Sequence, residues 1–385
     1  MKPNAFDKRV KRRVTAREHT FFAVCPPGLT TSCMDEIHKM GIEPDKAAAV
    51  KGGIEVLGKP DTGMALNLHL RIPSRILMRT GSFKATDFKR FESKIDAIEW
   101  ELFLPAAATP VFKVTCRKSA LYHSDALAHR ADKIITRKRG RDNTPPLDLP
   151  RPVEQLVFIR GDHDRFQISV DTSGDLLFRR GIKTVVTQAP LRETLASAML
   201  GWSGFRHGDI LIDPMCGSGS FSLEGAMVSC GIPPGFFRSF AFEALPGFSQ
   251  KTFAWQKSQA QKQFTPAAAP TIFASDTDDN ALKALSQNSC HPLLHSQIRI
   301  EKRDFFDIDP EHLYGDKNGV VMLNPPYGKR LGKKNKTLSL YREIGKKLKS
   351  DFNGYNVGII LPDRDSYHQT GLKLNLNPIF HGGLK

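Results

Sequence analysis

The stretch DILIDPMCGSGSF, residues 209–221, joins a short apolar run to a turn of small residues. The run has the length and composition of a buried β-strand, and a helix is expected after the turn. Glycines in such a turn carry no Cβ, so the backbone can come close to a ligand. The stretch lacks the GK[ST] ending of a phosphate-binding loop, which counts against an ATPase. It therefore predicts a strand–turn–helix unit at a ligand site.

Four further apolar runs follow, each separated from the next by helical stretches: TIFASD (271–276), IRIEKRD (298–304), GVVMLNPP (319–326) and NVGIILP (356–362). This alternation predicts an α/β domain built on a doubly wound, mostly parallel sheet. Ligands in such a sheet bind beyond the carboxyl ends of the strands. We therefore expect the chemistry at the residues that end each run.

Two of these runs end in an acid. Asp276 ends the second run, where a carboxylate suits hydrogen bonds to ribose hydroxyls. Asp304 ends the third run, where it can accept a hydrogen bond from an adenine amino group while Phe305 packs on the base. Either acid alone could equally be a helix N-cap. Their positions at the ends of successive strands favour a nucleotide site.

The fourth run ends in Asn324-Pro325-Pro326-Tyr327, the most specific motif in the chain. Two prolines stiffen the loop and hold the amide and the aromatic ring in a fixed relation. The Asn324 side-chain carbonyl and a neighbouring backbone carbonyl can accept both hydrogens of an sp² amino group. Tyr327 can stack on an extruded base. The motif predicts chemistry on the exocyclic amine of a nucleobase.

Taken together, these motifs resemble class I S-adenosylmethionine (SAM)-dependent amino methyltransferases that act on nucleobases. Earlier stretches narrow the resemblance to bacterial THUMP-domain RNA methyltransferases, of the RlmL type that forms N2-methylguanosine in large-subunit (23S) ribosomal RNA. The stretches are AVCPPGL (23–29), GGIEVLG (52–58), LRIPSRIL (70–77), RRG (179–181) and APLRETLASAML (189–200). The resemblance covers the chain from about residue 19 to its last residue.

The basic composition of residues 1–18, with no apolar periodicity, predicts a flexible tail. The resemblance implies three folded parts after it: a ferredoxin-like module (19–75), an α+β THUMP RNA-binding domain (76–182) and a Rossmann-like methyltransferase domain with a mostly parallel seven-stranded sheet (183–385). Larger members of the family carry a second methyltransferase domain, and no second modification is expected of this chain.

Site roles are likewise implied by the resemblance. The residues expected to bind SAM are Asp213, Pro214, Cys216, Gly217, Gly219, Asp276, Asp304 and Phe305, with Thr194 as a weaker contact. Asn324, Pro325, Pro326 and Tyr327 are expected to hold the target base. Because the sulfonium methyl group is already electrophilic, the protein mainly aligns and desolvates the reactants. The sequence identifies no strong general base, and no metal is expected.

Composition favours a polyanionic partner. The chain has 56 lysine and arginine residues against 40 acidic ones, a formal net charge of +16. An excess of that size suits phosphates, through release of their counterions. Six cysteines show no CxxC pair and no zinc spacing, which indicates free thiols in a reducing cytoplasm. No apolar run reaches the ~18 residues of a membrane span.

Three alternatives stay open from the sequence. The NPPY motif also suits an N6-adenine methyltransferase on DNA or RNA, and a transfer-RNA guanine-N2 enzyme is a close variant. A ribosome-assembly factor with a vestigial methyltransferase fold is the alternative without catalysis. Intact Asp213, Asp276, Asp304 and Asn324 count against that last possibility, because a degenerate site would be expected to lose at least one of them. The expected partner is 23S rRNA or a large-subunit assembly intermediate; the sequence does not define an oligomeric state.

Overall fold

The structure is a computed structural model that describes residues 4–139, 154–185, 191–311, 319–326 and 334–380. The chain forms two compact units. The first unit comprises Met1–Cys25, Met34–Leu177 and Ser239–Lys257, and the second comprises Pro26–Cys33, Phe178–Arg238 and Ser258–Lys385. Each unit has its own sheet, and each is described separately below.

The first unit contains a seven-stranded sheet in the order β2-β3-β1-β4-β7-β6-β5. Its strands are β1 (His19–Val24), β2 (Ala47–Val50), β3 (Gly53–Gly58), β4 (Arg75–Lys84), β5 (Thr109–Arg117), β6 (Glu154–Asp162) and β7 (Arg165–Asp171). All neighbouring pairs are antiparallel except β5 and β6. β4 pairs with β1 over residues 75–78 and with β7 from Leu77 to Lys84, so one sheet runs through the expected boundary at 75/76.

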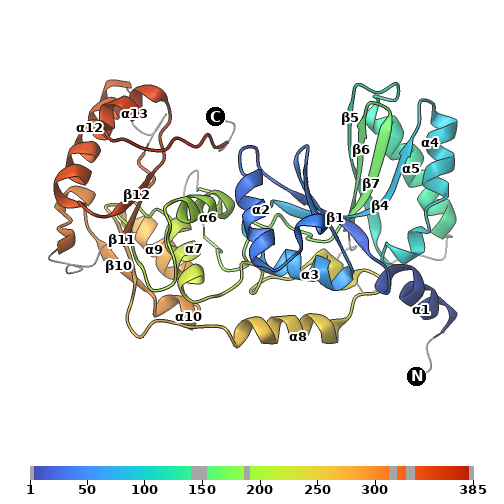
Figure 1. Cartoon of the computed structure of the whole chain (residues 1–385), viewed down its shortest axis with the longest axis horizontal. Helices are drawn as coiled ribbons and strands as arrows, with labels where there is room; N and C mark the ends of the chain where they lie inside the picture. The colour runs from blue at the N-terminus through green and yellow to red at the C-terminus, as the bar shows by residue number, and fades with distance from the viewer. Residues whose placement is uncertain (1–3, 140–153, 186–190, 312–318, 327–333, 381–385) are drawn as a thin grey trace. The chain divides into compact units, whose positions relative to one another are not determined.

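Four helices accompany this sheet: α2 (Thr30–Lys39), α3 (Pro60–His69), α4 (Phe88–Asp96) and α5 (Ser124–Arg139). α4 and α5 pack on each other beside β4–β7 (Figure 1). Phe91, Trp100, Leu127, Ile135 and Phe166 are among the buried residues that join them to the sheet. Burial of apolar side chains of this kind is the main stabilising contribution in such a layer.

Residues 4–15 differ from the flexible tail expected over 1–18. They form α1 (Ala5–Val10) and a π-helical turn (Lys11–Thr15). Asn4 caps the helix in a reciprocal box with Asp7. Val10 and Val14 are buried. The tail was expected because its basic residues dominate the composition, and the two valines, four residues apart, supply the apolar stripe that orders it.

Ser239–Lys257 also depart from the expected organisation, because they fall within the range 183–385 but belong to the first unit. Phe240 and Phe242 stack at 5.0 Å between ring centroids, and Phe253 meets Phe242 edge-on at 4.9 Å. The backbone N–H of Phe242 donates to the carbonyl oxygen of Thr172 at 3.0 Å. The ring contacts hold the segment together internally. Leu245, which packs on the buried cluster around Trp100, and Gln256 Nε2, which donates to the Asp61 carbonyl oxygen at 2.9 Å, join the segment to the rest of the first unit.

The second unit contains a five-stranded parallel sheet in the order β10-β9-β8-β11-β12. Its strands are β8 (Ile210–Asp213), β9 (Ile272–Asp276), β10 (Ile298–Lys302), β11 (Gly319–Leu323) and β12 (Asn356–Ile359). The α/β class and the parallel sheet are confirmed, with five of the seven expected strands among the described residues. From β8 the chain first adds β9 and β10 on one side and then β11 and β12 on the other. Such a change of side opens a crevice at the carboxyl ends of the strands, beside β8.

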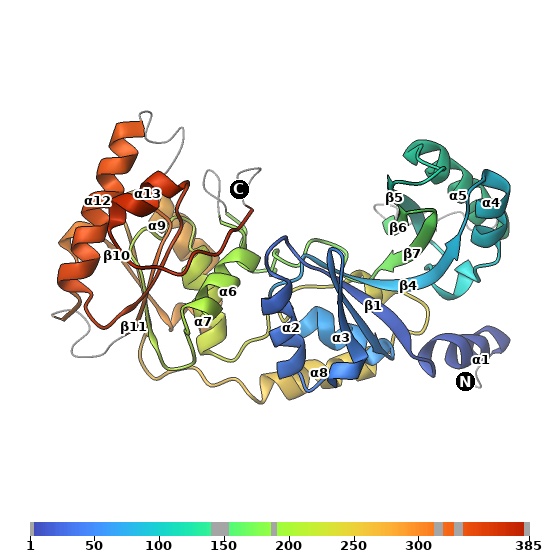
Figure 2. The same cartoon turned by 45° about the horizontal axis from the view of Figure 1, so that its top comes forward.

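The helices of the second unit are α6 (Glu193–Trp202), α7 (Ser220–Ser229), α9 (Asp279–Asn288), α10 (Pro292–His295), α12 (Lys334–Asp351) and α13 (Arg364–Thr370); α8 (Gln250–Gln261) runs from the first unit into the second. α6, α7 and α9 lie on one side of the sheet and α12 on the other (Figure 2). Ile344 and Leu348 of α12 pack on Val321 and Leu323 of β11. None of the described helices is long and apolar enough to cross a membrane.

Candidate active site

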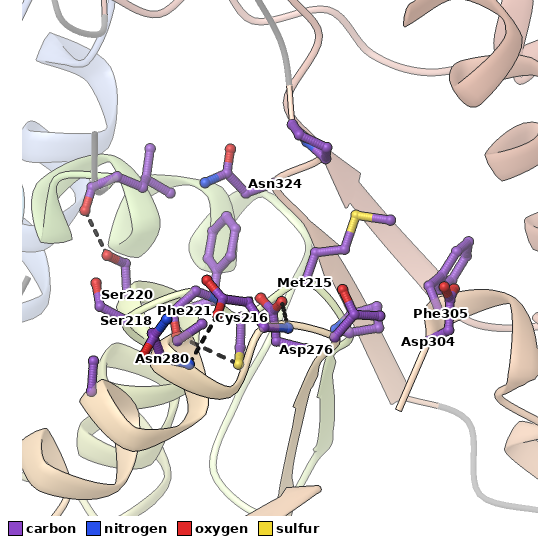
Figure 3. Close-up of a pocket in the computed structure, with 18 of the residues that line it drawn as sticks. Met215, Cys216, Ser218, Ser220, Phe221, Asp276, Asn280, Asp304, Phe305 and Asn324 are labelled. Carbon is purple, nitrogen blue, oxygen red and sulfur yellow. Dashed lines mark hydrogen bonds between the residues drawn. The ribbon is translucent and has the colours of Figure 1, made fainter. Parts of the chain in front are cut away.

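A cavity of about 760 Å³ lies at the carboxyl ends of β8, β9, β10 and β11. Four of the five strand-end segments contribute to its wall, as the architecture predicts. Figure 3 shows Ser218 and Ser220 at one end of the cavity, Asp304 and Phe305 at the other, and Asn324 between them. The residues expected to bind SAM that line it are Pro214, Cys216, Gly217, Asp276, Asp304 and Phe305.

The turn after β8 depends on glycine. Gly217 and Gly219 adopt φ angles of 53° and 84°, in the left-handed region. A Cβ on Gly219 would lie 2.2 Å from Leu285 Cδ1. Gly219 is the N-cap of α7 and is not part of the cavity wall. Gly219 therefore lies behind the wall. Because it has no side chain, α7 can begin close to the cavity.

Asp213 also lies behind the wall. Its side chain is fully buried, and Oδ2 accepts hydrogen bonds from the Ser222 hydroxyl at 2.6 Å and the Ser222 N–H at 3.1 Å. Burial raises the pKa of this carboxyl to about 7, although the Ser222 bonds oppose the rise. Oδ1 has no hydrogen-bond partner among the described residues. Asp213 was expected to line the cavity, but it is not part of the cavity wall.

Asp276 is half-buried and Asp304 is exposed, and each combines structural hydrogen bonding with a position in the cavity wall. Asp276 Oδ2 accepts from the Gly217 N–H at 2.9 Å, which ties the end of β9 to the turn after β8. Asp304 Oδ1 accepts from the Phe306 N–H at 2.9 Å as the N-cap of a short 3₁₀ turn. A carboxylate has about four acceptor positions, so both retain capacity for a ligand in the cavity.

Aromatic rings flank Asp304. Phe305 is buried and stacks on Phe352, with 5.8 Å between ring centroids. Phe306 is 38% exposed and also lines the cavity. Sequence reasoning missed Phe306, and the signal was the second phenylalanine of the doublet that follows Asp304. The two rings offer an apolar surface at this end of the cavity.

Asn324 stands at the end of β11 and lines the cavity together with Pro326. Its side-chain oxygen Oδ1 is buried and has no hydrogen-bond partner among the described residues. A buried acceptor without a partner costs free energy of about 1–3 kcal/mol, so a hydrogen bond from a ligand to this oxygen would be favourable. Pro325 is described but does not contribute to the wall, and Tyr327 lies outside the described residues.

Thr194 is buried in α6 and does not reach the wall. The same region supplies a residue that sequence reasoning missed. Lys183 Nζ donates to the Ser220 hydroxyl at 2.8 Å and lies 3.2 Å from Glu193 Oε1. Ser220 lines the cavity, and its hydroxyl donates to the Leu191 carbonyl oxygen at 2.6 Å. The Lys183 side chain is only 9% exposed, so a buried cation stands directly behind this end of the cavity.

Two further contacts hold the segment that carries Lys183. Arg180 and Glu224 form a fully buried ion pair with 2.7 Å between Nε and Oε1. Asn288 Oδ1 accepts from the Thr184 and Val185 N–H groups at 2.9 and 3.0 Å. Buried pairs with several hydrogen bonds fix one geometry, because breaking one partner leaves a charge unpaired.

No cluster of three or more His, Cys, Asp or Glu side chains in the described part of the chain is arranged to hold a metal ion. Burial raises the pKa of the Cys216 thiol well above its usual value, and Asp213 and Asp276 add to the rise. That thiol is protonated at neutral pH and is a poor nucleophile.

Comparison with known proteins identifies the class and then the family. Residues 180–370 match the model of the RMKL-like methyltransferase domain, and residues 20–77 match the RlmL ferredoxin-like domain. The crystal structure of SMU.472 complexed with SAH superposes with a TM-score of 0.83 at 26% identity, over 96% of each chain. The fold and cavity are those of a SAM-dependent methyltransferase. Residues 180–370 are thus an RMKL-like methyltransferase domain, and residues 20–77 are an RlmL ferredoxin-like domain.

Two sequence relatives extend over nearly the whole chain. Ribosomal RNA large subunit methyltransferase K/L of Syntrophotalea carbinolica is 30% identical over 95% of this chain and 52% of its own length. The Synechocystis sp. protein slr0064 is 29% identical over 96% of both chains. The chain thus spans about half the length of the K/L relatives it matches.

Proposed function

We propose that this chain transfers a methyl group from SAM to the exocyclic N2 amine of a guanine in 23S rRNA. The observation that carries the proposal is Asn324 in the cavity wall, whose buried Oδ1 has no hydrogen-bond partner within the part of the chain that the structure describes. An amino group is the partner that such an acceptor needs, because its two hydrogens can satisfy Asn324 Oδ1 and the backbone carbonyl of Pro325.

The cavity fits SAM by the chemistry of its wall. We assign Asp276 to the ribose hydroxyls, and Asp304 with Phe305 to the adenine ring. Cys216 and Gly217, supported by Asp213, Pro214 and Gly219, would face the methionine part, and Thr194 would act only through α6. When bound, SAM supplies an electrophilic methyl group on a sulfonium sulfur.

Asn324 would act on the nucleophile. The lone pair of a guanine N2 amine is delocalised into the ring, so the planar amine is a poor nucleophile. Accepting both of its hydrogens favours a pyramidal nitrogen whose lone pair points away from Asn324. Pro326 and Tyr327 would hold the base, with Tyr327 stacked on its face. Water is the expected acceptor of the proton lost, since the amide of Asn324 does not titrate.

The substrate assignment rests on the relatives and on charge. The K/L relatives are named for large-subunit ribosomal RNA, and the net charge of +16 suits an RNA partner or an assembly intermediate that carries it. An N6-adenine amine would meet the same Asn324 geometry. A transfer-RNA guanine would do so as well, and the choice among them is made by experiment.

The decisive experiment uses labelled SAM with undermodified large-subunit rRNA, tRNA and duplex DNA, each digested to nucleosides and read by mass spectrometry. Labelled N2-methylguanosine from rRNA alone is the expected result. N6-methyladenosine, or label only in DNA or tRNA, would overturn the assigned base or substrate. SAM binding without label in any of the three, or in purified large-subunit precursors, would favour the binding protein without catalysis.

Asn324→Ala tests the mechanism directly. We expect kcat to fall on the order of 100-fold, a loss typical of removing one group that stabilises a transition state, while SAM affinity stays within twofold. Asn353→Ala, in an exposed turn outside the cavity, is the matched control and should retain wild-type turnover. Near-wild-type turnover of Asn324→Ala would refute the role of this loop.

A further inference from the structure

A second cavity lies in the first unit, where the N-terminal helical segment meets β4 and the chain that follows α4. Its volume is about 430 Å³, within the ~300–1,000 Å³ range of small-molecule sites. The wall is built from three parts of the sequence, residues 13–19, 80–83 and 94–103. It shares no residue with the cavity that holds Asn324.

Two backbone irregularities shape this cavity. The π-helical turn Lys11–Thr15 presents Arg13 to the wall. The register of β4 against β7 shifts between Arg79 and Gly81, which places Thr80 in the wall. π-helical turns and β-bulges cost regular hydrogen bonding and occur often at functional sites.

The wall contains three basic side chains that are available to bind an anion. Arg13, Arg17 and Lys94 are exposed, and their side chains make no hydrogen bond or ion pair with the described residues. The wall also contains two acids, but each is paired with a cation outside the wall. Glu18 lies 3.2 Å from Lys46 Nζ, and Glu99 lies 3.2 Å from Arg9 Nη2. Three cations therefore remain for an anion.

The remaining wall is aromatic and hydroxylated. His19 meets Phe103 edge-on, with 6.3 Å between ring centroids. Burial lowers the pKa of His19 below its usual value, so the ring is neutral at pH 7, and its Nε2 donates to the Val14 carbonyl oxygen at 2.9 Å. Phe83 and Ser82 also line the cavity. Rings beside unpaired cations are the combination that binds a base and its phosphate.

We infer that this cavity binds one nucleotide of an RNA strand, with its phosphate on Arg13, Arg17 and Lys94 and its base against His19 and Phe103. The inference rests on the proposed function only in taking RNA as the partner. Because the site lies in the first unit, it would anchor the strand by a contact separate from the methylated base.

The test compares two double variants of the full chain that remove the same formal charge. The cavity variant, Arg13→Ala with Lys94→Gln, removes two of the three basic side chains from the wall. Arg12→Ala with Lys89→Gln removes exposed cations from the same turn and the same helix, outside the wall. Binding of a fluorescein-labelled single-stranded RNA 12-mer is followed by anisotropy over a range of salt, and SAM affinity is measured for each protein.

We expect the cavity variant to lose about tenfold in RNA affinity and to flatten the plot of log K against log salt by about 1.4, for two phosphate contacts at 0.7 each. The control should stay within twofold, and all proteins should bind SAM equally. Equal losses in both variants, with SAM binding and methylation intact, would overturn this inference alone. Wild-type protein that binds SAM but neither binds nor methylates RNA would overturn the proposed function as well.

Competition with 5′-guanosine monophosphate separates a strand from a free nucleotide. A strand site should keep its RNA in the presence of millimolar monophosphate, since neighbouring contacts hold the strand. Displacement of the 12-mer from wild-type protein, but not from the cavity variant, would identify a free-nucleotide site and overturn the assignment to RNA.

Discussion

Lys183 places a buried positive charge one hydrogen bond behind the end of the cavity formed by Ser218 and Ser220. One of its three N–H donors goes to Ser220 and one faces Glu193. SAM carries a carboxylate at its methionine end. A cation at this distance in a site of low dielectric attracts that carboxylate more strongly than it would in water.

Lys183→Met should therefore weaken binding of SAM and SAH about tenfold and leave binding of 5′-methylthioadenosine, which lacks the carboxylate, unchanged. Titration calorimetry measures all three. Lys283→Met, on the exposed face of α9, is the control and should bind every ligand as the wild type does. Equal weakening of SAM and methylthioadenosine in Lys183→Met would mean that the lysine only supports the fold.

Asp213 gives the stability of the second unit a pH dependence. Its pKa rises from 3.8 in the unfolded chain to about 7 in the native state, because burial disfavours the charged form. The native state then binds more protons between these values, so this group stabilises the protein at low pH and the contribution is lost as pH rises towards 7.

We expect Asp213→Asn to remove most of that slope between pH 5 and pH 8, as measured by urea unfolding. The pKa of Asp213 differs by about three between the native and the unfolded state. At about 1.36 kcal/mol for each pKa unit, the largest change in the free energy of unfolding from this group is about 4 kcal/mol. Ser222 keeps a hydrogen-bond acceptor in this variant. An unchanged slope would assign the pH dependence to other groups, of which Asp171, with its pKa raised to about 6 in the first unit, is the foremost.

Among the elements, the turn from β8 into α7 is the least tolerant of change. Gly219→Ala would combine a left-handed φ of 84° with a Cβ 2.2 Å from Leu285. We expect a loss of about 1–3 kcal/mol in stability, from backbone strain and overpacking, and weaker SAM binding because Cys216 and Gly217 shift with the turn.

Gly201→Ala is the matched control, since its added Cβ in α6 would meet no described atom within 4 Å beyond its chain neighbours and its own helix backbone. Alanine in a helix is favoured over glycine by about 0.8–1.0 kcal/mol, so this variant should be as stable as wild type or more so. Thermal unfolding with and without SAM compares the two. A Gly219→Ala protein with unchanged Tm and SAM affinity would contradict the reading of this turn.

The elements around the cavity are also where sequence and structure agree best. Runs that end in Asp276, Asp304 and Asn324 predicted parallel strands, and parallel strands bring their ends to one edge, where these residues share a wall. That Asp213 and Thr194 lie behind the cavity wall could not be predicted. Neighbouring residues in a turn or helix point in different directions, and the sequence does not tell which of them faces the cavity. Phe306 and Lys183 depend on tertiary packing that no local pattern encodes.

At the scale of the whole molecule, the sequence predicted consecutive domains, and the chain instead passes between its units at 25/26, 33/34, 177/178, 238/239 and 257/258. At the last two passages, the contacts of Leu245 with the buried cluster around Trp100 and of Gln256 with the Asp61 carbonyl oxygen keep residues 239–257 in the first unit. Pattern reasoning assigns such a segment to its neighbours in sequence, since aromatic residues do not specify which surface they cover. The division into a ferredoxin-like module, a THUMP domain and a catalytic domain at 75/76 and 182/183 stays a prediction.

A fragment of residues 178–385 should consequently be poorly soluble, because it would expose the aromatic side chains of Ser239–Lys257 that belong to the first unit. Replacing residues 239–257 in that fragment with a glycine–serine linker should restore solubility, as judged by gel filtration. A soluble, monomeric fragment without the replacement would show that the segment does not depend on the first unit.

The position of Ser239–Lys257 also sets an order of events during synthesis. Domains generally fold as they leave the ribosome, the N-terminal one first. Here the first unit cannot be completed when its strands have been made, because its last piece is translated only after Phe178–Arg238 of the second unit. During that interval the Thr172 carbonyl oxygen lacks the Phe242 N–H that it accepts in the finished fold, so the first unit is completed only after part of the second has been translated.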